Sequence, residues 1–121
     1  MSGSRPVTPA ATPSIVGRRL RQRREQLGWS LERVGVAIGL EESSARARIS
    51  RYELGVHQPP EAATQALAQA LGVPHAFLHC QEDRLAELIL AASELPAADQ
   101  ATLLQSIRDR LAQIQPARRP E

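Results

Sequence analysis

Aromatic residues are nearly absent from this chain of 121 residues, which has one Trp, one Tyr and one Phe. A core with so few aromatics must be built from Leu, Ile, Val and Ala. Ala and Leu are strong helix formers, and runs of β-branched residues typical of strands are missing. We therefore predict an all-α protein with one domain and an appendage.

Cysteine and long apolar runs are scarce as well. The single cysteine, Cys80, cannot form an internal disulfide, which fits a reducing compartment. No apolar run approaches the ~20 residues of a membrane span, and the N-terminus has no apolar signal core. We therefore expect a soluble cytoplasmic protein with no membrane partner.

Lysine is missing altogether, since all fifteen basic residues are arginine. Residues 14–60 carry nine arginines against five acids, whereas residues 61–121 carry five arginines against eight acids. A basic front half indicates contact with a polyanion such as DNA. A solvated helix surface is the alternative explanation of the same pattern.

The chain divides into four segments. Residues 1–13 are rich in Pro, Ser and Thr, which predicts a flexible arm, and residues 115–121 form a Pro/Arg tail. Residues 14–79 read as a domain of short helices, and residues 82–114 read as a C-terminal helical pair. From periodicity and capping residues, we expect helices over 14–27, 30–39, 61–71, 74–79, 82–94 and 97–113, and a further helix that lies within 42–54.

The last of these helices carries an apolar row with alternating spacings of three and four residues. That spacing is typical of the seam between two helices, so we expect the C-terminal pair to dimerise or to cover the back of the domain. The row consists of Leu104, Ile107, Leu111 and Ile114.

The segment 30–55 reads as two short helices joined by a glycine turn, with arginines on the second helix. Ala45, Ile49 and Tyr52 share one side of that second helix. A DNA-reading helix needs such an apolar side for docking and a polar side for the major groove. An ordinary amphipathic helix with a charged face is the alternative. The candidate base-reading residues are Arg46, Ala47, Ser50 and Arg51, with Ser43 and Ser44 near the start.

The chain resembles the Cro/phage-repressor-type (XRE) helix-turn-helix family over residues 15–78. The resemblance implies a five-helix domain that binds operator DNA, usually as a homodimer on an inverted repeat, and it favours a repressor. It is carried by LRQRREQLGWS at 20–30, IGL at 38–40, ISRYELG at 49–55, Pro59 and ALAQALGV at 66–73.

The resemblance also implies roles for single residues. Arg24 and Glu53 match positions that pair and lock the first helix to the third, so we treat them as a structural ion pair. Arg46 and Ser50 fall where the family reads bases, and His57 lies in a loop that commonly contacts phosphate. Further DNA backbone contacts are expected from Arg18, Arg19, Arg21 and Arg48.

One departure from the family is a length difference beside the base-reading residues. Ile49 follows Gly39 by ten residues, which is about one helical turn more than usual. Either the recognition helix gains an N-terminal turn, or the turn is longer, with Ser43 or Ser44 as the N-cap. Because Glu41 and Glu42 would repel phosphate, we expect a longer turn or a helix end angled away from the DNA backbone.

Two other functions receive less support. His75, His79 and Cys80 have the spacing of metal ligands on a helix, but no fourth ligand is near in the sequence. We therefore expect no metal and no cofactor. No catalytic constellation is present, so we expect no enzyme.

The main alternative to a repressor is an antitoxin-like protein, which binds a partner protein through its C-terminal helices and binds DNA secondarily.

Overall fold

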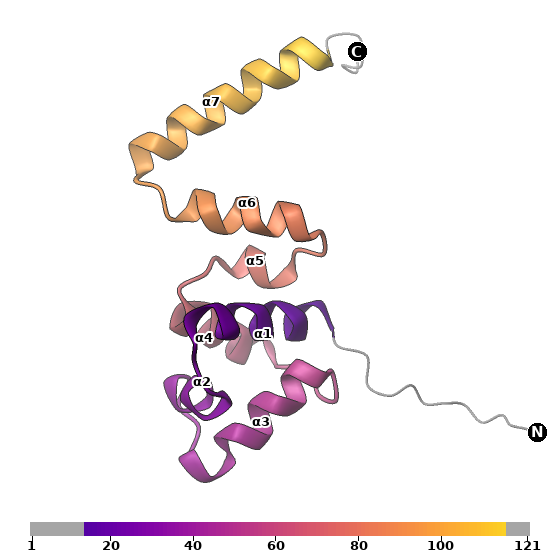
Figure 1. Ribbon diagram of the computed structural model, residues 1–121, viewed down its shortest axis with the longest axis vertical. Helices are drawn as coiled ribbons and strands as arrows, with labels where there is room; N and C mark the ends of the chain where they lie inside the picture. Colours follow the sequence, from indigo (N-terminus) through magenta and orange to yellow (C-terminus); the bar gives the residue numbers. More distant parts are fainter. Residues whose placement is uncertain (1–13, 116–121) are drawn as a thin grey trace, which may run out of the picture.

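The computed structural model describes residues 14–115, which contain seven α-helices and no strand (Figure 1). The all-α prediction is therefore confirmed. The predicted arm 1–13 lies outside the described residues, as does the tail beyond residue 115. The helices are α1 (Ile15–Leu27), α2 (Leu31–Ala37), α3 (Glu42–Leu54), α4 (Glu61–Leu71), α5 (His75–His79), α6 (Asp83–Ser93) and α7 (Ala97–Ile114).

Local capping signals set several helix boundaries. At the start of α1, the Ser14 hydroxyl accepts a hydrogen bond from the Gly17 backbone N–H at 3.0 Å. At the start of α2, Ser30 accepts one from the Arg33 N–H, also at 3.0 Å. Each serine satisfies a donor that the first helical turn leaves unpaired. Gly55 ends α3 with a φ of 81°, in the left-handed region that favours glycine.

The hydrophobic core lies among α1 to α5 and receives one buried residue from α6. Leu20, Ile49, Leu67 and Phe77 come from four different helices, and all are fully buried. Ala86 of α6 is buried in the same core. The core is mainly aliphatic, as the composition predicts.

Two glycines allow α3 to lie close to its neighbours. A Cβ atom at Gly35 of α2 would collide with Ala45 of α3. A Cβ atom at Gly17 of α1 would lie 2.5 Å from the carbonyl oxygen of Tyr52. Both glycines thus let a helix pass closer than any larger residue would allow. The inner side of α3 is held by α1 and α2 together.

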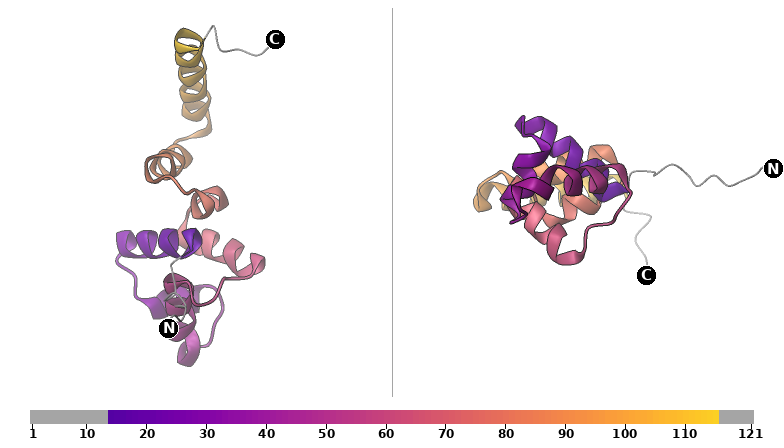
Figure 2. Two further views of the ribbon diagram at one scale, coloured as in Figure 1. Left: turned by 90° about the vertical axis from the view of Figure 1, so that its right-hand side faces the viewer. Right: turned by 90° about the horizontal axis from the view of Figure 1, so that it is seen from below.

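The two C-terminal helices differ in how they meet the domain. α6 packs on α5, whereas α7 projects away from the body of the protein (Figures 1 and 2). α7 has no buried residue. The two helices share no extended interface, although the Gln100 side-chain amide donates a hydrogen bond to the Ala92 carbonyl at 2.8 Å. No helix within residues 14–115 combines the length and apolarity needed to cross a membrane.

Candidate DNA-binding surface

The extra residues before Ile49 belong to the N-terminal part of helix α3, which begins at Glu42. Glu41 is the N-cap, and no side chain caps the helix. The Ser44 N–H donates a hydrogen bond to the Glu41 carbonyl at 3.0 Å, so Ser43 and Ser44 lie inside the first turn. The expected longer turn, with one of these serines as N-cap, is therefore wrong.

Packing against α2 explains why α3 begins so early. Ala45 is fully buried and lies against Gly35, so its backbone must already be helical to make this contact. The connection from α2 is also tight, because the Leu40 N–H donates a hydrogen bond to the Gly35 carbonyl at 2.9 Å. Gly39 allows this turn with a φ of 96°.

α3 has one buried face and one exposed face. Ala45, Ile49, Tyr52 and Glu53 are buried, and Ser50 is half-buried at the boundary. This division places every candidate base-reading residue at the surface or at its edge. Among the candidate DNA-contacting residues of α3, the exposed ones are Ser43, Ser44, Arg46, Ala47, Arg48 and Arg51.

The arginines of α3 have no partner among the described residues. Arg46, Arg48 and Arg51 take part in none of the ion pairs or side-chain hydrogen bonds within 14–115, whereas the ion pairs there do engage arginines of α1. Three guanidinium groups on one exposed face leave their donors available to an outside acceptor.

Arg24 and Glu53 form the ion pair that the family resemblance implies. Arg24 Nε lies 2.6 Å from Glu53 Oε2, and Arg24 Nη2 lies 3.1 Å from Oε1. A third donor, Arg24 Nη1, reaches the Trp29 carbonyl at 3.0 Å. The hydrogen bond to Glu53 raises the pKa of Arg24 against the opposing effect of burial. This bidentate pair ties α1 to α3.

Arg19 is buried, which does not fit the DNA backbone contact expected from the sequence. Its side chain is buried, with 1% of the residue exposed. It donates hydrogen bonds to the Cys80 carbonyl at 2.8 Å and to Asp83 Oδ1 at 2.9 Å, and its guanidinium lies 5.9 Å from the Phe77 ring centroid. These partners lie about sixty residues away in the chain, so no local pattern indicates them.

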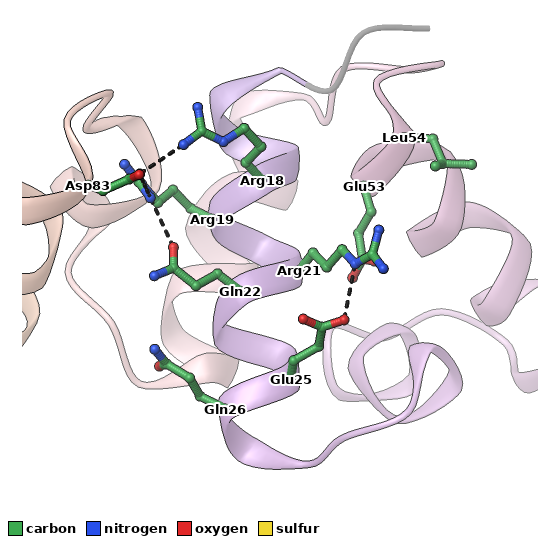
Figure 3. A pocket seen from close by; sticks show the side chains of 9 residues that line it. All are labelled: Arg18, Arg19, Arg21, Gln22, Glu25, Gln26, Glu53, Leu54 and Asp83. Carbon is green, nitrogen blue, oxygen red and sulfur yellow. Dashed lines mark hydrogen bonds and ion pairs between the residues drawn. The ribbon is translucent and has the colours of Figure 1, made fainter. Parts of the chain in front are cut away.

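Arg18 and Arg21 of α1 are more exposed, but each has a carboxylate partner (Figure 3). Arg18 Nη2 lies 2.8 Å from the Oδ1 atom of Asp83, and Arg21 Nε lies 3.1 Å from the Oε2 atom of Glu25. Hydrogen bonding from Arg19, with the charges of Arg18 and Arg19, lowers the pKa of Asp83. His57 is exposed in the loop after α3.

Two further arginines have structural contacts that sequence reasoning missed. Arg23 Nε donates a hydrogen bond to the Leu71 carbonyl at the end of α4, at 3.0 Å. The guanidinium of Arg33 lies 4.2 Å from the centroid of the Trp29 ring. The four-residue spacing of Trp29 and Arg33 is a usable sequence signal. No sequence signal indicates the contact between Arg23 and Leu71.

Comparison with known proteins agrees with this geometry. Residues 15–78 match the family described as a helix-turn-helix domain. The chain belongs to the helix-turn-helix family. It is also similar to the crystal structure of the transcriptional regulator BswR, with 41% sequence identity and a TM-score of 0.76. That match covers 79% of this chain and 95% of BswR. No curated protein sequence matches the chain.

The helix-turn-helix domain includes α1 to α5, and its matched region ends at Leu78. This is a non-enzymatic DNA-binding family, so the predictions of DNA binding and of no enzyme are confirmed. α6 and α7 lie beyond the matched residues.

Proposed function

We propose that this protein is a cytoplasmic transcriptional repressor that binds an inverted-repeat operator as a homodimer, with α3 in the major groove. The exposed face of α3 carries the proposal, because three arginines there have no internal partner within 14–115 while the opposite face is held by α1 and α2. Similarity to BswR, a transcriptional regulator, supports the regulatory role.

The side chains of α3 suit the reading of base edges. Arginine can bond guanine through two donors, serine can bond several bases, and alanine can contact the thymine methyl group. We assign these contacts to Arg46, Ala47, Ser50 and Arg51. The N-terminal part of α3 extends the same exposed face to Ser43 and Ser44.

Contacts to phosphate would come from residues around this face. Arg48 and His57 are exposed, and Arg18 and Arg21 can exchange their surface carboxylate partners for phosphate. Glu41 and Glu42 are exposed at the start of α3. Their charge favours an orientation in which this end of the helix is angled away from the backbone.

Selection of binding sites from random DNA, followed by a salt titration, tests the proposal. We expect an enriched inverted repeat with half-sites about one helical turn apart. Affinity for that site should exceed affinity for a scrambled duplex by roughly 10³-fold or more. Equal affinity for both duplexes over the whole salt range would contradict sequence-specific binding.

The apolar row of α7 supports the homodimer. Leu104, Ile107, Leu111 and Ile114 are between 43% and 53% exposed. An isolated helix is only marginally stable in water, so such a row needs a partner surface. The same apolar row on α7 of a second copy of the chain supplies a matching surface.

Sedimentation tests the dimer. Deleting residues 96–121 should change a dimer to a monomer and leave the helix-turn-helix domain folded. The single change Leu111→Glu should act in the same direction, and Gln113→Glu on the same helix is its matched control. If neither the deletion nor Leu111→Glu changes the sedimenting species, dimerisation through α7 is excluded.

The exposure of α7 also favours a second candidate function, in which α7 binds a different protein, as in an antitoxin. A monomer in sedimentation, together with a protein that co-purifies with the full chain and is lost on deletion of 96–121, would favour this function over the homodimer.

A further inference from the structure

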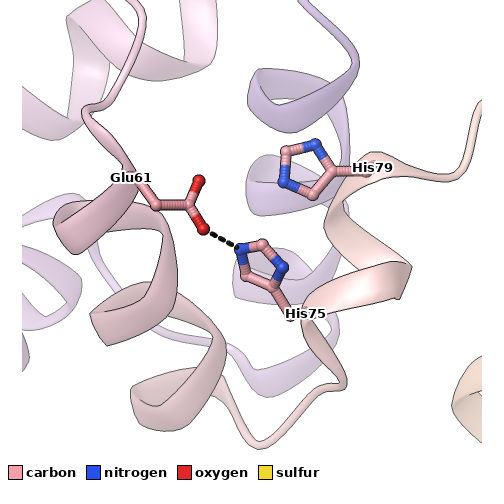
Figure 4. Close-up of side chains that lie close together, drawn as sticks. All are labelled: Glu61, His75 and His79. Atoms are coloured by element: carbon pink, nitrogen blue, oxygen red, sulfur yellow. Dashed lines mark ion pairs between the residues drawn. The ribbon is translucent and has the colours of Figure 1, made fainter.

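A second cluster of polar side chains lies on a different part of the protein, where α4 begins and α5 passes it. Glu61 is the first residue of α4, and His75 and His79 are the first and last residues of α5. Each offers one ligand atom, and the three atoms lie within 4.8 Å of one another. Figure 4 shows the carboxylate and both imidazole rings turned toward the same space.

The contact between Glu61 and His75 has the spacing of two ligands on one metal ion. His75 Nε2 lies 3.2 Å from Glu61 Oε2. The geometry is nevertheless not that of a hydrogen bond, and His75 Nε2 is a buried atom with no hydrogen-bond partner within residues 14–115. With metal–ligand bonds of about 2.0–2.1 Å, neighbouring ligands of a tetrahedral ion lie roughly 3.3 Å apart.

His79 supplies the third ligand from the same helix as His75. Residues four apart lie on one helical face, and the two ring centroids are 4.8 Å apart. His79 is exposed, so water can reach the site from its side. Cys80 takes no part, since its Sγ atom is directed to the Glu82 carbonyl at 3.5 Å.

The core holds the backbones of all three ligands in place. Phe77 and Leu78 of α5 are fully buried, as is Leu67 of α4. Only side-chain rotations are therefore needed to bring the three ligand atoms to bonding distance. When the backbone around a site is already held in place, binding an ion costs little conformational entropy of the ligand residues.

We propose that Glu61, His75 and His79 bind a divalent transition-metal ion of the zinc, cobalt or nickel class, with water completing the coordination. Two imidazoles favour these ions over Mg²⁺ and Ca²⁺, which take oxygen ligands. The ion links the start of α4 to α5, and it should therefore stabilise the folded chain. This replaces the expectation of no metal, which rested on His75, His79 and Cys80 alone.

Titration of the full chain with cobalt chloride and zinc chloride tests the site. The protein should carry no polyhistidine tag and should first be treated with a chelator. We expect one equivalent of Co²⁺ to bind with visible absorption bands of a site with nitrogen and oxygen ligands. Zn²⁺ should displace it and raise the melting temperature, and Mg²⁺ should do neither.

Variants separate this site from adventitious binding. Glu61→Gln and His79→Ala change exposed side chains, and each should weaken Co²⁺ binding at least about tenfold. His57→Ala removes the third histidine of the chain, outside the cluster, and Cys80→Ser removes the thiol; both should bind as the parent does. The proposal is overturned if the parent binds no Co²⁺, or if Glu61→Gln and His79→Ala bind as tightly as His57→Ala.

Discussion

Helices α1 and α3 carry most of the arginines of the helix-turn-helix domain, and they use them in opposite ways. All five arginines of α1 have a partner within the protein: Arg21 pairs with Glu25 on the same helix, and the other four reach the Leu71 carbonyl, Glu53 or Asp83. The three arginines of α3 have no internal partner within residues 14–115. α1 packs against α3, α4 and α5, whereas no other part of residues 14–115 covers the outer face of α3. The unpaired donors of α3 are therefore directly available to DNA, whereas Arg18 and Arg21 of α1 would first have to exchange a carboxylate partner for phosphate.

Removing Arg24 should have the largest effect on stability. Arg24→Ala leaves Glu53 buried without its partner, since the Glu53 side chain is only 6% exposed. We expect a loss of about 3–5 kcal/mol in the free energy of unfolding, measured by urea denaturation. A loss below 1 kcal/mol would show that the pair does not hold α1 to α3.

A double-mutant cycle sharpens this test. Glu53→Ala and the double variant should show that the two changes are strongly non-additive, because each removes the same interaction. Arg46→Ala is the matched control on α3, and its unfolding free energy should stay within about 0.5 kcal/mol of the parent.

Arg19→Ala should destabilise the fold by about 2–4 kcal/mol, because it removes a buried side chain and leaves the Cys80 carbonyl without its donor. Unfolding measured by circular dichroism in urea checks this. The salt dependence of DNA binding by the folded variant should remain that of the parent. A smaller salt slope would place Arg19 on phosphate and remove the distinction between α1 and α3.

Arg46→Ala should weaken binding to the selected operator by about 1–3 kcal/mol and relax the choice of base at one position. Fluorescence anisotropy with the operator and with single-base variants measures both effects. An equal loss on operator and scrambled DNA would instead assign Arg46 to phosphate, as we propose for Arg48.

Asp83 should give the smallest effect, and this effect should be lost in acid. Its pKa is lowered in the folded protein, mainly by the hydrogen bond from Arg19, so its contribution is present above the unfolded-state pKa of about 3.9. That contribution is lost as the pH falls through the lower folded-state pKa. The difference in unfolding free energy between the parent and Asp83→Asn should therefore shrink from pH 6 to pH 3. A constant difference would mean that the charge of Asp83 contributes nothing.

The starts of α1 and α2 and the two faces of α3 were predictable because their causes are local. Ser14 and Ser30 cap the helices that they precede, and the buried Ala45, Ile49 and Tyr52 follow helical spacing. The pairing of Arg24 with Glu53 came from the family resemblance, since no local rule joins residues that far apart.

The amino-acid sequence by itself determined an all-helical protein, a helix-turn-helix family and an arginine-rich face, because caps, periodicity and motif spacing act over a few residues. Only the tertiary structure decided which arginines remain available, since Arg19 is buried by Asp83 and Cys80 from distant segments. It also decided the early start of α3, through the contact of Ala45 with Gly35, and the meeting of Glu61 with two histidines. Each of these depends on chain segments that become neighbours only when the helices pack.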